Sequence, residues 1–257
     1  MIKNEKKPEQ LPDSAELQKI RAAVRRSHKG ILGKLKKQYG LSITKETALP
    51  AMQRLTDLVS AGPVDPGGRL SKLLAKRNRK INARYHTLKS YAGRQGGGGS
   101  CDMLMFGLFR MKFNGCEVMA VYNLMRYLGY KTDIRDIAYW FETHGSMLLG
   151  GFGVRPDAIV NYLKENTDAE VTTLGPSQFH EYDNLFADAK AAVFSFWNGP
   201  DKWTIHTVML RHLRNGRVRV FNMFNDRLYS DFDSVSAMCS KNKLIPISMI
   251  LISENCE

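Results

Sequence analysis

Residues 203–226 read WTIHTVMLRHLRNGRVRVFNMFND, with an apolar run on each side of Asn215-Gly216. An Asn-Gly pair between two such runs is a strong short-range signal of a β-hairpin. Helical periodicity precedes this region and strand-like runs surround it, which predicts an α+β fold with an antiparallel sheet. The predicted helices span 114–128, 133–141 and 156–165, and the other predicted strands span 171–174, 191–197 and 244–252.

Two turn geometries fit this hairpin, and they place different residues beside His206. A two-residue turn puts Asn225 directly opposite His206. A three-residue loop, with Gly216 in the left-handed position of a bulge, pairs Val208 with Asn222 instead. Asn222 is then the diagonal neighbour of His206 on one face of the sheet. The apolar pattern favours this second geometry, although it sets two arginines opposite each other across the strands.

The predicted helix over 114–128 opens with Asn114-Gly115-Cys116-Glu117. A cysteine in the first turn of a helix lies near unpaired backbone N–H groups and the positive end of the helix dipole, and both favour the reactive thiolate. A small buried cysteine without chemistry is the alternative. A histidine that takes the thiol proton and an asparagine that orients its ring would complete a site for covalent thiol catalysis.

These residues resemble papain-fold cysteine peptidases, in which a cysteine opens a long helix and a histidine lies on a later strand. The Asn sixteen residues after the histidine also fits that group. The apolar helix NGCEVMAVYNLMRYLGY and the glycine-rich loop after it are most similar to the C39-like branch, which includes the double-glycine leader peptidases of bacteriocin exporters. The resemblance covers residues 101–252 and implies that Cys116 is the nucleophile, His206 the general base and Asn222 the orienting residue. It also implies cleavage after small residues, glycine above all.

The oxyanion site is where the sequence departs from that family, which usually has a Gln a few residues before the nucleophile. The stretch LFRMKFNGC has none, so Arg110, Asn114 or backbone amides alone would have to serve. The predicted oxyanion and substrate-binding residues are Asn114, Gly115, Gly150 and Gly151. The departure leaves three alternatives: peptide hydrolysis, another acyl-transfer reaction, and an inactive module that binds a peptide or protein.

The charge of the 257-residue chain, a net +13, is concentrated in its first third. Residues 1–95 hold 22 Lys and Arg against 7 Asp and Glu, whereas residues 96–257 hold 16 against 18. The change falls at the Gly4Ser stretch 96–100, a flexible tether that is either natural or engineered. We therefore expect a basic all-α module over 1–95, a linker, and a papain-like domain over 101–257. The helices expected in the module span 15–38, 47–62 and 70–91.

Two kinds of partner are open for this basic module. Lys and Arg within residues 69–94 could neutralise the phosphates of a nucleic acid. The favoured alternative is that the module docks on the papain-like domain as its partner, substrate, pro-region or regulator, because three short helices bury little apolar surface on their own.

Several classes of protein are excluded by composition. No apolar run reaches the ~18 residues of a membrane span, and the N-terminus lacks the apolar core of a secretory signal. The four cysteines show no CxxC spacing, which indicates a reduced, cytoplasmic protein. The histidines have no metal-binding spacing and the GGFG segment lacks a phosphate-loop context, so no metal or cofactor is expected.

Overall fold

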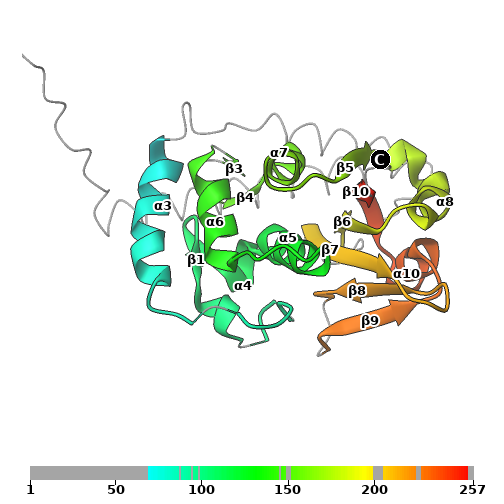
Figure 1. Ribbon diagram of the computed structural model, residues 1–257, viewed down its shortest axis with the longest axis horizontal. Helices are drawn as coiled ribbons and strands as arrows, with labels where there is room; N and C mark the ends of the chain where they lie inside the picture. Colours follow the sequence, from blue (N-terminus) through cyan, green and yellow to red (C-terminus); the bar gives the residue numbers. More distant parts are fainter. Residues whose placement is uncertain are drawn as a thin grey trace, which may run out of the picture.

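The computed structural model describes residues 69–253 apart from residues 87, 94, 98, 145, 149–151, 199–204 and 224–226. Its centre is a six-stranded antiparallel sheet with the strand order β5-β10-β6-β7-β8-β9 (Figure 1). The strands are β5 (Glu170–Leu174), β6 (Ala191–Trp197), β7 (Ile205–His212), β8 (Val218–Phe221), β9 (Tyr229–Phe232) and β10 (Ile245–Ser253). The predicted α+β class is confirmed.

Helices surround this sheet, and most of those described were expected from the apolar periodicity. They are α3 (Arg69–Asn82), α4 (Met111–Asn114), α5 (Cys116–Tyr127), α6 (Ile134–Thr143), α7 (Pro156–Asn166), α8 (Tyr182–Ala187) and α10 (Val235–Asn242), with 3-10 turns at Ser100–Met103 and Pro176–Glu181. Two short strand pairs lie outside the main sheet: β1 (Met105–Phe106) with β2 (Phe109–Arg110), and β3 (Met147–Leu148) with β4 (Phe152–Val154). The helices α4, α8 and α10, the strand β9 and the two short strand pairs were not predicted.

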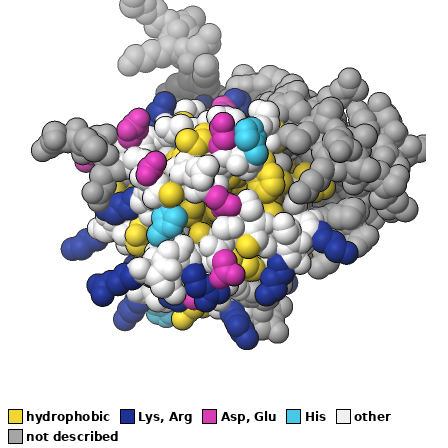
Figure 2. Space-filling model, turned by 90° about the vertical axis from the view of Figure 1, so that its right-hand side faces the viewer, with side chains coloured by type: hydrophobic (Ala, Val, Ile, Leu, Met, Phe, Trp, Pro, Cys, Tyr) yellow, Lys and Arg dark blue, Asp and Glu magenta, His cyan; other side chains and the backbone are white. Residues whose placement is uncertain are grey.

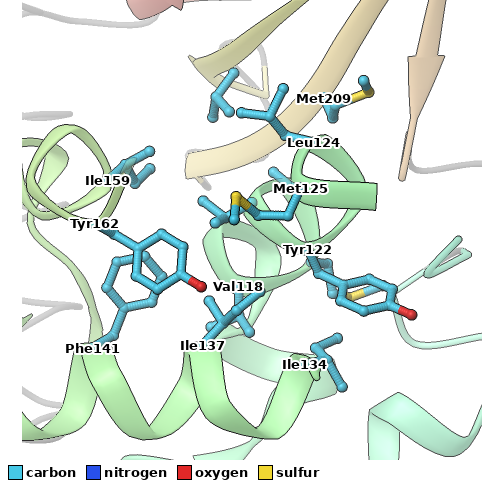
Figure 3. Close-up of a cluster of buried hydrophobic side chains, with 14 of the residues drawn as sticks. Val118, Tyr122, Leu124, Met125, Ile134, Ile137, Phe141, Ile159, Tyr162 and Met209 are labelled. Atoms are coloured by element: carbon cyan, nitrogen blue, oxygen red, sulfur yellow. The ribbon is translucent and has the colours of Figure 1, made fainter. Parts of the chain in front are cut away.

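The sheet has a buried cluster of apolar side chains on each face. On one face, α5 packs against β7, and Leu124 of α5 lies toward Met209 of β7 (Figure 3). The rest of α5 packs against α6 and α7 in the same cluster. The side chains labelled there are Val118, Tyr122, Met125, Ile134, Ile137, Phe141, Ile159 and Tyr162. On the other face, α8 and α10 cover a second cluster that includes Val208 and Leu210. The strand that carries His206 is therefore buried on both sides.

The register of the β7–β8 hairpin is the one that the apolar pattern favoured. Met209 pairs with Phe221 and Leu210 with Val220, which continues to Val208 opposite Asn222. Gly216 has a φ of 79°, as the bulged loop requires. The two arginines do oppose each other, Arg211 against Arg219. Asp231 of β9 compensates, because both of its carboxylate oxygens accept hydrogen bonds at 2.8 Å from Arg219.

The helix α3 packs against the rest of the described chain, whereas the docking of the whole basic module over 1–95 stays a prediction. In α3, Leu74 and Ala75 are fully buried, and the helix packs against α6 and β1. Asn78 Nδ2 donates to the Gly107 carbonyl at 2.9 Å and to Glu142 Oε1 of α6 at 2.5 Å. The change of composition at 96–100 therefore does not separate two parts that fail to touch. Residues before and after it contact each other, as Asn78 and Gly107 do. The helices expected at 15–38 and 47–62 lie outside the described residues.

Beyond Asn82 the chain leaves the helix, although the sequence predicted that the helix would continue to residue 91. Asn82 exchanges two hydrogen bonds with the backbone of Met105, at 2.9 and 2.8 Å. The carbonyls of Leu88 and Ser90 then accept bonds from the Tyr122 hydroxyl of α5, both at 3.1 Å. These carbonyls are bound by tertiary partners and not by the next helical turn, so tertiary contacts outweigh the local helix preference.

The surface of the sheet end carries both signs of charge. Figure 2 shows Lys and Arg toward the lower edge of this face, with acidic side chains among apolar ones nearer its middle. Within the described residues, no helix combines the length and the apolar character that crossing a membrane requires.

Candidate active site

The start of α5 is fixed by Gly115, the residue before Cys116. A Cβ at this position would lie 1.9 Å from Met111 Cγ and 2.8 Å from the Met111 carbonyl oxygen, so only glycine fits. The preceding Asn114 is buried and donates from Nδ2 to the Phe106 carbonyl at 3.1 Å. Its Oδ1 has no hydrogen-bond partner among the described residues. The predicted oxyanion residues Asn114 and Gly115 thus hold the helix start in place.

The thiol of Cys116 lies beside a carboxylate and a backbone amide. Its Sγ lies 3.2 Å from Glu117 Oε2, and the Thr207 backbone N–H of β7 is near enough to act on the thiol electrostatically. Burial raises the pKa of Cys116 well above its ordinary value, and the adjacent Glu117 carboxylate raises it further, while the Thr207 amide lowers it. At neutral pH this resting thiol is protonated, although a helix start by itself favours the thiolate.

Glu117 is itself an unusual neighbour for a thiol. It is 9 % exposed, and burial raises its pKa to about 7, against the opposing effect of backbone amides that include that of Val154 in β4. A carboxyl group with this pKa exchanges its proton near neutral pH. No local sequence pattern marks Glu117 as functional, because a glutamate in the first turn of a helix is a common feature that interacts favourably with the helix dipole.

His206 is buried near the start of β7, as predicted, and is neutral. Its Nε2 lies 2.5 Å from the Asn222 backbone carbonyl. A carbonyl oxygen only accepts hydrogen bonds, so Nε2 carries the proton and Nδ1 is the acceptor nitrogen. Burial lowers the pKa of His206 to about 4, and the bond to the carbonyl offsets only part of this effect. The ring edge packs on Phe196 of β6, with ring centroids 5.8 Å apart.

Asn222 reaches His206 through its backbone and not through its carboxamide. It follows β8 with a φ of 66°, a left-handed conformation that Asn tolerates better than most residues. Its Oδ1 accepts a hydrogen bond from the Gln95 backbone N–H at 2.7 Å, and its Nδ2 has no partner among the described residues. The structure therefore brings His206 and Asn222 together, by a different atom from the one that the family resemblance implies.

Gln95 is a further residue of this site that sequence reasoning missed. Besides its backbone bond to Asn222, its Nε2 donates to the Met111 carbonyl at 2.8 Å, one helical turn before Cys116. It therefore ties the end of β8 to the entry of α5. The family resemblance implies a glutamine a few residues before the nucleophile, and residues 108–115 contain none. Gln95 lies beyond the glycine run, where sequence distance hides its position in space.

The side chains of β7 alternate, which determines how Cys116 approaches this strand. Met209 packs in the cluster beneath α5, whereas His206 shares the other face with Val208 and its cross-strand partner Phe196. The amide that lowers the Cys116 pKa belongs to Thr207, the residue between His206 and Val208. The direct Cys116–His206 contact expected of a catalytic dyad stays a prediction.

The remaining predicted residues add nothing to this geometry. Gly150 and Gly151 lie outside the described residues, as does Asn225, the alternative neighbour of His206. The described part of the chain contains no group of three or more side chains suited to a metal ion. In the comparisons with known proteins, no family model matches the chain, and no curated protein matches it.

Proposed function

We propose that the chain is a cysteine peptidase or a related thiol acyl-transfer enzyme that acts on a peptide or protein, with Cys116 as its nucleophile. The observation that carries the proposal is that the backbone amide of Thr207, the residue after His206, lies near enough to the Cys116 sulfur to lower the pKa of the thiol. This proximity links the first turn of α5 to the strand residue beside His206. The same association of helix start and histidine strand is what a papain-like fold of the C39-like branch requires.

The reaction would use the polar groups that already surround the sulfur. The thiol attacks the substrate carbonyl, and backbone N–H groups of the first turn of α5 stabilise the oxyanion. The Thr207 amide stabilises negative charge on sulfur. His206, held in one tautomer by the Asn222 carbonyl, is available for proton transfer. Water then releases the acyl group from the thioester.

A binding module without turnover is the second function, and the resting charge state favours it. Cys116 is protonated and 6 % exposed, and His206 is neutral, so the thiolate–imidazolium pair of an active thiol peptidase is not formed. A papain-like domain in this state would hold a peptide or protein partner without cleaving it. The two functions differ in one property, which is covalent chemistry at Cys116.

Cleavage of a defined peptide panel separates these functions. The full chain would be incubated with peptides that vary only in the residue before the scissile bond, and the products weighed. We expect cleavage, with a preference for glycine, and its loss in Cys116→Ala. Cys239→Ala is the matched control, because Cys239 is an equally buried thiol on α10. Tight binding of the panel with no cleavage by the wild-type chain would leave the binding module as the function.

A further inference from the structure

Glu117 is the side chain that meets the Cys116 thiol, and its role deepens the proposed function and rests on it. The thiol lies 3.2 Å from Glu117 Oε2, and both residues are buried, with 6 % and 9 % of their surfaces exposed. The thiol donates and the carboxylate accepts. We propose that Glu117 is the catalytic base that takes the Cys116 proton as the sulfur attacks the substrate.

The chemistry of the two neighbouring groups supports Glu117 over His206 as this base. The pKa of His206 is lowered to about 4 by burial, so its imidazole holds a second proton poorly near neutral pH. The pKa of Glu117 is raised to about 7, which is close to the value that general-base catalysis favours at neutral pH. The geometry agrees, because the thiol hydrogen bond is made to Glu117.

Few other charges approach Glu117 from the elements around it. The strand β4 supplies the Val154 amide and has no titratable side chain. On α4, Lys112 is exposed to solvent. The Glu142 carboxyl of α6 is bound by Asn78 and by the Gly107 amide. His206 of β7 is the titratable group next to the Thr207 amide, which lowers the Cys116 pKa. Cys116 is therefore the titrating partner that Glu117 contacts directly.

The proposed step balances without any added reagent. The S–H bond breaks as its proton moves to Glu117 Oε2, and the sulfur forms a bond to the substrate carbonyl carbon. The carbonyl π electrons move to oxygen, which the backbone N–H groups at the start of α5 stabilise. The C–N bond then breaks, the carbonyl reforms as a thioester, and the leaving amine takes the proton back from Glu117. The carboxylate is restored, and the Thr207 amide stabilises the partial charge on sulfur.

The test is the pH dependence of Cys116 alkylation by iodoacetamide, followed by peptide mass spectrometry between pH 5 and 10. In the wild-type chain we expect the alkylation rate to rise with a midpoint near pH 7, where Glu117 becomes the carboxylate. Glu117→Gln should lose this rise and react about 100-fold more slowly at pH 7.5, the usual effect of removing a general base. A Glu117→Gln variant that reacts as fast as the wild-type chain, or faster, would overturn the proposal, because the carboxylate would then only hold the thiol protonated.

Two further variants make the result specific. Glu142→Gln removes another buried carboxyl group that does not contact the thiol, and it should keep the rise near pH 7. His206→Asn tests the other candidate base: loss of the rise in this variant, together with its retention in Glu117→Gln, would assign the base to His206 and contradict the proposal. Should Glu117→Gln fail to fold, the wild-type profile still decides, because a single rise above pH 9 would show that no carboxylate assists.

The outcome is separable from that of the proposed function. If Cys116→Ala abolishes peptide cleavage and Glu117→Gln cleaves with an unchanged pH profile, the enzyme stands and Glu117 is not its base. If the wild-type chain cleaves no peptide and its alkylation still loses the rise near pH 7 in Glu117→Gln, the peptidase assignment fails and the role of Glu117 toward the thiol stands.

Discussion

Two backbone positions hold the candidate catalytic side chains where they are, and each can be tested by a single substitution. Gly115 allows α4 to pass into α5 against Met111, and Asn222 turns the chain so that its carbonyl faces His206. Neither role depends on the chemistry of a side chain. Substitutions at these positions therefore report on the geometry of the site.

Gly115→Ala is expected to destabilise the fold by about 1–3 kcal/mol, because the added methyl group overlaps Met111 and the backbone cannot move away without shifting α5. Denaturant unfolding measures the loss. Gly175→Ala is the matched control, since its nearest neighbour would lie 4.0 Å from the new Cβ. Equal stability of the two variants would show that the junction between α4 and α5 is not tightly packed.

Asn222→Gly is expected to be more stable than Asn222→Ala by about 1–2 kcal/mol, because alanine is strained in the left-handed conformation. Both variants lose the bond from the Gln95 amide, so that loss cancels in the comparison. We also expect Asn222→Gly to keep peptide cleavage, since the group that holds His206 is a backbone carbonyl. If both variants lose activity equally, the carboxamide is the orienting group, as the family resemblance implies.

The sequence predicted that His206 and Asn222 lie together, but it did not predict which atom of Asn222 makes the contact. Cys116, His206 and Asn222 were all singled out, because helix-start and hairpin signals are local. The backbone contact of Asn222 was not predictable, since it depends on a left-handed φ after β8. Gln95 and Thr207 were missed because their roles come from tertiary proximity, which no local pattern encodes.

At the scale of elements, α3 is attached by a polar contact as well as by apolar packing. Asn78→Ala removes the bonds to Gly107 and Glu142 and is expected to lower the free energy of unfolding by about 1–3 kcal/mol, the usual cost of leaving buried polar groups unpaired. Lys76→Ala, at an exposed position of the same helix, should change it by less than about 0.5 kcal/mol. Equal effects of the two substitutions would contradict the buried contact.

The hairpin and α3 show how far sequence patterns determine elements. The apolar alternation in β7 and β8 determined the register, because a slip of one residue would expose the buried faces. The end of α3 was placed too late, because the Tyr122 hydroxyl of α5 binds the carbonyls of Leu88 and Ser90 and holds this segment in a tertiary contact. The strand β9 was missed because its side chains do not alternate in polarity.

For the whole molecule, the buried titratable groups predict how stability depends on pH. Burial raises the pKa of Glu142 to about 8 and that of Glu117 to about 7, from an ordinary value of 4.5. The folded chain holds these protons more tightly than the unfolded chain. The stability they contribute is fully present below about pH 4.5 and is lost as pH rises toward 8. His206 acts in the opposite direction, because its lowered pKa costs stability as pH falls from 6.5 toward 4.

Glu142→Gln should therefore flatten the alkaline side of the stability profile. Denaturant unfolding between pH 5 and 9 would show the free energy of unfolding of the wild-type chain falling above pH 6, and falling less in the variant. Equal slopes in the two proteins would mean that Glu142 is ionised in the folded chain and that its burial is compensated by Asn78 and Gly107.

The proposed function requires Cys116 to be a reactive thiol and not a buried packing residue, and its rate of alkylation in the folded chain distinguishes the two. The folded chain would be treated with substoichiometric iodoacetamide at pH 7.5, and the label at each cysteine quantified. We predict that Cys116 is labelled first, ahead of the buried Cys101 and Cys239, because Glu117 Oε2 contacts its thiol at 3.2 Å and can take the proton as the sulfur reacts. Labelling of Cys116 no faster than that of Cys101 and Cys239, or only after denaturation, would contradict the account.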